Sequence, residues 1–289
     1  MENETLRVIR NRTSLRVYDT SPLSEEEENT IIESALLAPT AGNQMLYSMI
    51  IIRDQEKKKQ LSKLCDHQLF IQSAPLVIVF VTDHHRWFDY YRMNNVKDFA
   101  EKNGLDFTSP AQGDLVLAIE DAMAAAQNSV IAAESMGIGS CYIGDILENY
   151  ETVKELLQLP DETFPIAMLC YGHYKDHHKK VFRKRFNRKY VVFEDSYRQL
   201  QKDDYEQMFA ERAEKEFLKQ SSRRTEPFQG TDVIQRAESI KKEKSSQRTE
   251  FKYEAENFAQ QFYARKTGAA FSKEMTRSVK EALKEWTGE

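Results

Sequence analysis

Alternating basic and hydroxyl side chains stand near the beginning of the chain, in the run Arg12-Thr13-Ser14-Leu15-Arg16. The run reads as an extended segment, in which residues two positions apart point to the same side. Two guanidinium groups and a hydroxyl on one side suit a phosphate or a polyol-phosphate tail. The run therefore indicates an anion-binding face. Three surface polar residues between helices would give the same pattern, and this alternative stays open.

A second basic cluster, with aromatic residues between its charges, lies at positions 179–190. Read alone, it fits a solvated face better than a nucleic-acid patch. The chain carries a formal net charge of -5, whereas a general nucleic-acid binder is usually basic overall. The cluster consists of Lys179, Lys180, Phe182, Arg183, Lys184, Arg185, Phe186, Arg188, Lys189 and Tyr190.

Several other motifs are excluded by their order or spacing. Gly137, Gly139 and Gly144 close an expected helix and open a strand, which reverses the order of a dinucleotide-binding fingerprint. Asp145 stands where a phosphate-binding loop of the Walker type needs a lysine. The histidines at positions 84–85 and 177–178 lack partners at metal-ligand spacing, so no metal site is expected.

The segments around these residues predict helices interleaved with strands. A first helix is expected over residues 4–11. Ser24 and Glu27 predict a capping box that opens a second helix, which ends by Pro39 and Gly42. Strands are expected at 47–53, 140–143 and 165–171, and the continuous apolar run at 75–81 predicts a strand buried on both faces. Polar and aromatic residues 84–113 indicate an inserted lid or loop.

An alanine-rich helix is expected over residues 114–136 and is apolar most of the way round. Such a helix must be buried, against the core or a second subunit. Gly137 is expected to end it in the left-handed conformation, and a short helix is expected near residues 150–157.

The chain has 289 residues and 40% hydrophobic content, enough for one large domain or one domain with an appendage. Beyond Asp203 it becomes charged and helical in pattern, with a polar loop at 221–231 and a final helix at 272–286. We expect a core over residues 1–202 and a helical extension over 203–289 that packs on the core or on a partner subunit.

The three cysteines, Cys65, Cys141 and Cys170, are too few and too scattered for a disulfide framework or a metal knuckle. Small buried core thiols are the expected reading. The longest apolar run, residues 74–81, is too short to cross a bilayer, and the first residues are acidic where a signal peptide is basic. We therefore expect a cytoplasmic protein without a membrane partner.

Taken in order, residues 4–197 resemble the nitroreductase family, and specifically its larger NADPH-dependent, oxygen-insensitive branch. Residues 12–16 are similar to the family's arginine-serine-arginine loop, and Ala38-Pro39-Thr40-Ala41-Gly42-Asn43 to its Ala-Pro-Ser-x-x-Asn helix end. Gln68 stands where the branch has a flavin-contacting glutamine.

The later segments continue the resemblance. Residues 126–144 look like the family's long central helix and Tyr-Ile-Gly-Gly turn, and Arg183-Lys184-Arg185 occupies the place of a Lys-Pro-Arg phosphate clamp. The chain departs from the family pattern in three places. Asp145 replaces the turn's second glycine, Lys184 replaces the clamp proline, and residues 84–113 have no counterpart.

The resemblance implies an α+β fold with a central, mostly antiparallel sheet flanked by helices, and FMN bound at the interface of a homodimer. It implies hydride transfer from NADPH or NADH to the flavin, then to a small-molecule acceptor such as a nitroaromatic, a quinone or a flavin. The cofactor carries this chemistry and the protein supplies position and charge, so no separate catalytic residue is expected.

The resemblance also implies which residues contact FMN. Arg12, Arg183 and Arg185 would bind the phosphate, Ser14 the phosphate or ribityl chain, and Arg16 the pyrimidine side, where a cation stabilises reduced flavin. The full expected set is Arg12, Thr13, Ser14, Arg16, Thr40, Asn43, Gln68, Tyr142, Ile143, Gly144, Asp145, Arg183 and Arg185.

Arg224 falls near a position where the NADPH-specific branch has an arginine in a mobile loop, with Lys219 and Arg223 beside it. An arginine fork binds a 2′-phosphate in bidentate fashion, which would favour NADPH over NADH. A solvated linker with incidental charge is the equal alternative for this segment. For the whole chain, an FMN-binding protein without efficient turnover is the main rival to an enzyme. A nucleic-acid role for the second basic cluster is disfavoured by the net charge and by its match to a flavin clamp.

Overall fold

A four-stranded antiparallel sheet lies at the centre of the structure, a computed structural model that describes residues 3–108, 110–224 and 255–287. The strands are β1 (Tyr47–Ile51), β2 (Leu76–Asp83), β3 (Ile138–Ile143) and β4 (Thr163–His173), in the order β1-β2-β4-β3. All three neighbouring pairs are antiparallel. This confirms the predicted α+β class with an antiparallel sheet.

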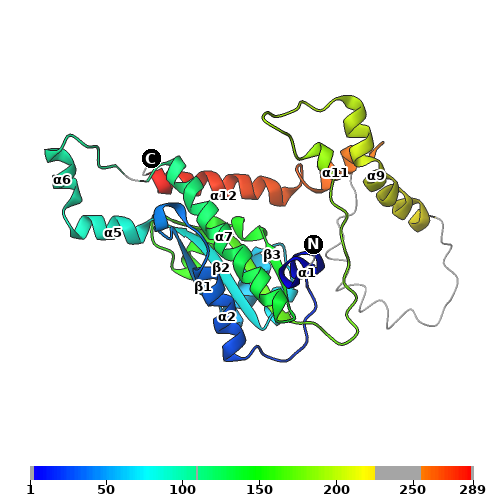
Figure 1. Ribbon diagram of the computed structural model, residues 1–289, viewed down its shortest axis with the longest axis horizontal. Coiled ribbons are helices and arrows are strands. Elements are labelled where there is room, and N and C mark those ends of the chain that lie inside the picture. The colour runs from blue at the N-terminus through cyan, green and yellow to red at the C-terminus, as the bar shows by residue number, and fades with distance from the viewer. Residues whose placement is uncertain (1–2, 109, 225–254, 288–289) are drawn as a thin grey trace. The chain divides into compact units, whose positions relative to one another are not determined.

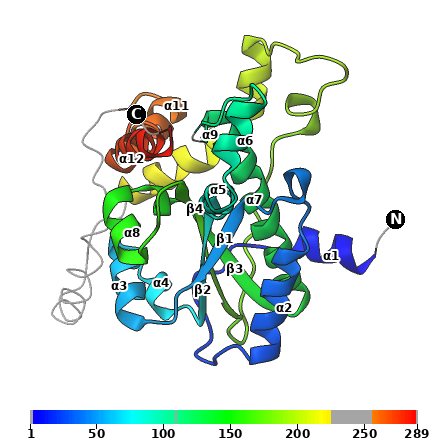
Figure 2. The same ribbon diagram turned by 90° about the vertical axis from the view of Figure 1, so that its left-hand side faces the viewer.

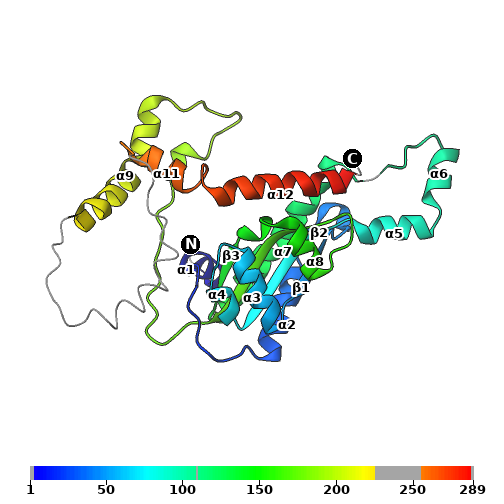
Figure 3. The same cartoon turned by 180° about the vertical axis from the view of Figure 1, so that it is seen from behind.

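Helices cover both faces of this sheet, which is why the middle strands are apolar on both sides. Leu76, Ile78 and Phe80 of β2 pack toward α2 (Glu25–Leu36) and α7 (Gln112–Ser135). The alternate residues Val77 and Val79 pack toward α3 (Gln55–Leu64), α4 (Phe70–Ser73) and α8 (Tyr150–Leu157). Figure 2 shows the sheet between the two helical layers, and Figure 3 shows α3 and α8 in front of it.

Local signals placed the helix ends accurately. The first helix, α1, spans Glu4–Asn11 as expected. Ser24 and Glu27 form the predicted capping box, in which the Ser24 hydroxyl accepts from Glu27 N and the Glu27 carboxylate accepts from Ser24 N. Gly137 follows α7 with a φ of 76°, the left-handed conformation predicted for a helix-ending glycine.

The central helix α7 is, within the described ranges, the one helix long and apolar enough to cross a membrane. Its alanine-rich face, including Ala122, Ala125 and Ala126, is buried against the sheet and α2, as in the core helix of a soluble protein, which passes the same test. Its opposite face leaves Val116, Leu117 and Met123 exposed.

The expectation of a loop at residues 84–113 is wrong for residues 85–93 and 96–102, which are helical, and a role as a lid stays a prediction. This segment forms α5 (His85–Met93) and α6 (Val96–Lys102), which run away from the sheet in Figure 1. Asp83 accepts a hydrogen bond from Arg86 N at 3.2 Å and so caps the first turn of α5. Trp87 and Tyr91, four residues apart, bring their rings within 5.7 Å. The residues of α5 are mostly aromatic and charged. The sequence therefore lacks the aliphatic residues at helical spacing from which a helix is usually predicted.

The chain divides into two compact units, residues 1–182 with 273–289, and residues 183–272. This division differs from the expected boundary after residue 202. In the first unit, helix α12 (Ala270–Thr287) buries Trp286, 2% exposed, beside Leu46 and Leu115.

The second unit contains α9 (Lys202–Arg224), α11 (Phe258–Arg265) and the short 3-10 helix η3 (Arg188–Tyr190). The loop expected at residues 221–231 is wrong for its first four positions, because α9 continues to Arg224. The remainder of that loop lies outside the described residues.

Two facing glycines allow residues 12–18 to pack across β3 and β4. Gly139 and Gly172 are register partners in these strands. A Cβ on Gly139 would lie 2.5 Å from Leu15 Cδ2, and one on Gly172 would lie 2.7 Å from Tyr18 Cδ1. Backbone pairing fixes the segment further, since Leu15 N donates to Ser140 O at 2.9 Å. The glycine pair therefore determines where the predicted anion-binding run lies.

We expect Gly139→Ala to lower the free energy of unfolding by about 1–3 kcal/mol, the usual cost of overpacking. Urea denaturation measures it. Gly113→Ala is the matched control, because its added Cβ meets no atom within 4 Å in the first turn of α7. It should leave stability unchanged or raise it by up to about 1 kcal/mol. Equal stability of Gly139→Ala and wild type would contradict the packing described.

Candidate functional site

The run at residues 12–16 alternates as predicted. Thr13 is 7% exposed and Leu15 is fully buried, whereas Ser14 and Arg16 are exposed and Arg12 is half-buried. Arg12, Ser14 and Arg16 therefore share the outer face. The side chain of Thr13 points to the opposite side, where its hydroxyl finds no hydrogen-bond partner among the described residues.

This basic face lies beside the end of β3, where the expected turn residues stand. The strand ends at Ile143, Gly144 follows, and the 3-10 helix η2 (Asp145–Leu147) begins directly after it. Gly144 is exposed with an ordinary φ of -80°, and a Cβ there would meet no atom within 4 Å. The chain itself does not require a glycine here, so the open space is free for an external group to approach the backbone.

Gln68 lies at the same end of the sheet, although it is far from Asp145 in the sequence. Its side-chain Nε2 donates to Asp145 Oδ2 at 2.5 Å and to the Cys65 carbonyl at 3.0 Å. Arg16 lies close as well, with its Cζ 5.9 Å from the ring centroid of Phe70. The structure thus gathers Gln68, Arg16 and Asp145 at one end of the sheet.

At this end of the sheet, basic side chains lie near Cys141 and acidic side chains lie near Glu148. Burial raises the pKa of the Cys141 thiol, although the nearby Arg16 guanidinium opposes the shift. Burial, together with the carboxylates of Asp145 and Asp66, raises the pKa of Glu148 to about 7. All three cysteines are buried, which confirms the prediction of core thiols for Cys141 and Cys170.

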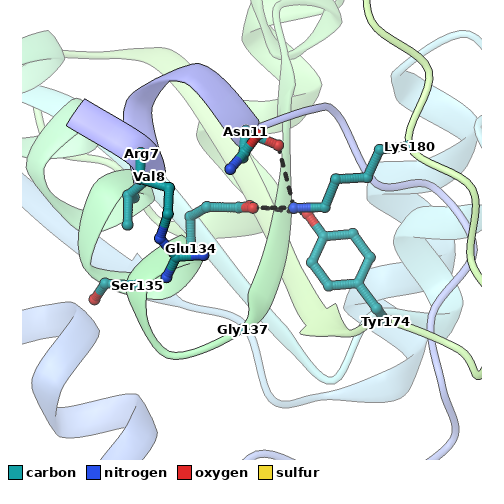
Figure 4. A pocket seen from close by; sticks show the side chains of 8 residues that line it. All are labelled: Arg7, Val8, Asn11, Glu134, Ser135, Gly137, Tyr174 and Lys180. Atoms are coloured by element: carbon teal, nitrogen blue, oxygen red, sulfur yellow. Dashed lines mark hydrogen bonds and ion pairs between the residues drawn. The ribbon is translucent and has the colours of Figure 1, made fainter. Parts of the chain in front are cut away.

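Glu134 of α7 is a buried carboxylate whose role the sequence pattern did not reveal. Its contacts hold two segments of this region together. Glu134 forms an ion pair with Lys180 and accepts from the Tyr174 hydroxyl at 2.8 Å. Lys180 Nζ also donates to the Asn11 carbonyl at 3.1 Å, directly before Arg12. Figure 4 shows these groups around a pocket of about 420 Å³. Through Lys180, Glu134 thereby ties the start of the anion-binding run to the first residues of the second basic cluster.

A second buried carboxylate of α7, Asp121, holds the loop that contains Thr40 and Asn43. Its Oδ1 accepts from Ala41 N at 2.8 Å and its Oδ2 from Leu46 N at 3.1 Å. Asp121 and Glu134 are two of the four acidic residues in this largely apolar helix. Their place on its apolar, buried face was the signal that could have revealed both anchors, because a buried carboxylate needs donors.

The structure does not bring the whole expected set together in one chain. Thr40 and Asn43 precede β1, at the sheet edge opposite β3. Arg183 and Arg185 are exposed and belong to the second unit. Lys219, Arg223 and Arg224 lie in the last part of α9, where side chains are outside the described part of the structure. The residues that do lie together are Arg12, Ser14, Arg16, Gln68, Tyr142, Ile143, Gly144 and Asp145.

Lys180→Ala would leave Glu134, whose side chain is 4% exposed, without its cationic partner. We expect the free energy of unfolding to fall by about 1.5–3 kcal/mol, the range for hydrogen bonds to charged groups. Urea denaturation measures this change. Lys59→Ala is the control, because its pair with Glu56 is exposed on both sides and should contribute less than about 1 kcal/mol. A loss no larger than the control's would show that Glu134 needs no cation.

Comparison with known proteins places this arrangement in a family. The family model described as "Nitroreductase family" matches residues 9–173, more than half of the chain. The FMN reductase (NADPH) of Bacillus subtilis (strain 168) is 35% identical over 173 residues, covering 59% of this chain and 66% of that protein. That alignment spans just under two thirds of the relative's own length. The NADPH-flavin oxidoreductase of Vibrio harveyi is 30% identical, with 70% and 78% of the two chains covered.

Solved structures agree with the fold. NfrA1 of B. megaterium superimposes with a TM-score of 0.63 at 30% identity, covering 85% of this chain and 98% of that one. Nitroreductase A of Vibrio parahaemolyticus RIMD 2210633 superimposes with a TM-score of 0.68, covering 98% of each chain, and at 23% identity it supports the fold alone. With the antiparallel sheet, the basic run beside β3 and the family match over residues 9–173, the chain belongs to the nitroreductase family.

Proposed function

We propose that the chain is an FMN-dependent oxidoreductase that uses NADPH or NADH to reduce a small-molecule acceptor. The observation that carries this proposal is the shared outer face of Arg12, Ser14 and Arg16 beside the open end of β3 at Gly144. Both names of the relatives compared above, FMN reductase (NADPH) and NADPH-flavin oxidoreductase, support the same cofactors.

The side chains present fit FMN chemically. Arg12 and Ser14 offer a guanidinium and a hydroxyl to the phosphate and ribityl chain, and Arg16 offers a cation to the pyrimidine side of the ring. Tyr142 and Ile143 lead to Gly144, where backbone can meet a planar group without a side chain in between. FMN held here would supply hydride transfer from a nicotinamide to a nitroaromatic, quinone or flavin acceptor, for which a ping-pong order is proposed. Arg16 would place a cation at the pyrimidine side of the ring, where it would stabilise reduced flavin.

The remaining expected residues would contact FMN or NADPH from outside the cluster around Gly144. Arg183 and Arg185 would clamp the phosphate from the second unit, and Thr13 would contribute through its backbone rather than its inward side chain. Lys219, Arg223 and Arg224 would bind the 2′-phosphate of NADPH, which would give NADPH the preference over NADH.

We further propose a cytoplasmic homodimer. Thr40 and Asn43 lie at the sheet edge opposite the basic run, so a second copy is needed to bring these residues to the same flavin. The exposed apolar side chains Val116 and Leu117 on α7, and Met93 on α5, supply a surface for that copy to cover.

An FMN-binding protein without efficient acceptor turnover is the second candidate, and Asp145 is the observation that favours it. Its carboxylate stands where the family pattern has glycine, at the end of β3 beside Gly144. A charge at this position can hinder an anionic or bulky acceptor while leaving FMN bound.

We expect Arg12→Ala and Arg185→Ala each to weaken FMN binding by about 1.5–3 kcal/mol, the range for a charge-assisted hydrogen bond. Quenching of flavin fluorescence on titration of the apoprotein gives the dissociation constants. Arg188→Ala is the matched control from the same basic cluster, outside the expected clamp. Unchanged dissociation constants in both test variants would remove these arginines from the FMN site.

Anaerobic titration separates the two candidate functions. The FMN-loaded protein should lose its flavin absorbance on addition of NADPH and regain it on addition of a quinone, in separate half-reactions. Protein that carries FMN but does not bleach with NADPH or NADH would support the binding protein. Bleaching without reoxidation by any quinone or nitroaromatic would do the same.

A further inference from the structure

The side-chain amide of Gln68 is fixed in one orientation by two partners that can only accept hydrogen bonds. Its Nε2 donates to the Cys65 carbonyl and to the Asp145 carboxylate, at 3.0 and 2.5 Å. An amide nitrogen has two protons, so both are used. A flip of the amide would place its oxygen against two acceptors. The orientation therefore follows from the chemistry of the partners.

This orientation turns Gln68 Oε1, an acceptor, away from these two partners, and no hydrogen bond to this oxygen is found among the described residues. Gln68 is half-buried beside the run that carries Arg16, whose guanidinium lies over Phe70, two positions after Gln68. The Arg16 guanidinium supplies donors and the Gln68 amide oxygen supplies an acceptor at this end of the sheet. The pyrimidine edge of oxidised flavin offers the complement, two carbonyl oxygens flanking the ring's only N–H.

We propose that Asp145 is a positioning residue for FMN, which holds Gln68 so that its Oε1 accepts a hydrogen bond from the flavin ring N–H. The proposal rests on the proposed function and deepens it. It assigns a role to the carboxylate that replaces a family glycine: Asp145 acts through Gln68 rather than by touching the acceptor.

The carboxyl group of Glu148 is buried close to Asp145. Glu148 is 7% exposed, and its Oε1 has no hydrogen-bond partner among the described residues. It faces Asp145 on η2, Asp66 before α4 and Glu274 on α12, and burial with these charges raises its pKa to about 7. Glu148 therefore takes up a proton near neutral pH.

The backbone before Gln68 shows that this position is built rather than incidental. Asp66 and His67 have φ values of 55° and 52°, in the left-handed region that ordinary residues seldom adopt. The loop is closed by Gln68 N, which donates to Ser62 O at 3.1 Å, and by Ser62 Oγ, which donates to Gln68 O at 3.0 Å. Strain of this kind persists only where surrounding contacts hold it, and the contact with Asp145 is one of them.

The test compares binding of FMN and of N3-methyl-FMN, which lacks the ring N–H, to the apoprotein. Wild type should bind FMN about tenfold more tightly, the equivalent of ~1.4 kcal/mol. Asp145→Gly and Gln68→Leu should each abolish this preference, and the double variant should lose nothing more. Asp145→Asn retains an acceptor oxygen and should restore most of the preference. Asp161→Asn, an exposed carboxylate paired with Lys154, is the control and should leave the preference unchanged.

Thermal unfolding of each apoprotein checks that the variants remain folded, and a variant that does not fold is replaced by Asp145→Ala or Gln68→Met. A preference that disappears in Gln68→Leu but survives in Asp145→Gly would overturn the positioning role. Equal affinity of wild type for the two flavins would overturn the hydrogen bond to the ring, while the proposed function would stand. Failure of wild type to bind FMN at all would remove the proposed function and this inference together.

Discussion

The packing of residues 12–18 against two facing glycines is the constraint on which the rest of the site depends. Leu15 and Tyr18 occupy the space that side chains at Gly139 and Gly172 would fill. Because these two residues are fixed against the sheet, strand-like alternation sends Arg12, Ser14 and Arg16 to the outside. The same packing also places residues 12–16 beside the end of β3. The absence of two Cβ atoms thus determines where two positive charges stand.

The central helix α7 extends this control to the neighbouring segments. Its small side chains let it lie close to the sheet, and its two buried carboxylates accept from groups far along the chain. Asp121 holds the loop before β1. Glu134 pairs with Lys180, and the Lys180 ammonium also donates to the carbonyl of Asn11, the residue before Arg12. A buried charge without donors is costly, so each carboxylate strongly favours the one arrangement that supplies them. The helix thus serves as both core and scaffold.

At the end of the sheet where Gly144 lies, two basic side chains of residues 12–16 stand near two acidic side chains. Arg12 and Arg16 stand on the side of the run, whereas Asp145 and Glu148 stand on η2 and directly after it. The buried thiol of Cys141 lies between them and remains protonated, since burial raises its pKa. This separation of charge is consistent with a cofactor whose phosphate needs cations and whose ring carries both donors and acceptors. In the proposed function, the protein would contribute position and electrostatics, and the cofactor would supply the redox chemistry.

The sequence by itself determined the features that depend on a few neighbouring residues. The capping box at Ser24, the alternation of residues 12–16 and the buried strand β2 were all predictable, because local hydrogen bonds and side-chain period set them. The family resemblance added the residues that are expected to contact FMN. Helix α5 escaped prediction because its aromatic face gave no aliphatic period. Only the tertiary structure placed Gln68 on Asp145 and Glu134 on Lys180, 77 and 46 positions apart in the chain. Contacts at such separations depend on strand order and close packing, which no local pattern encodes.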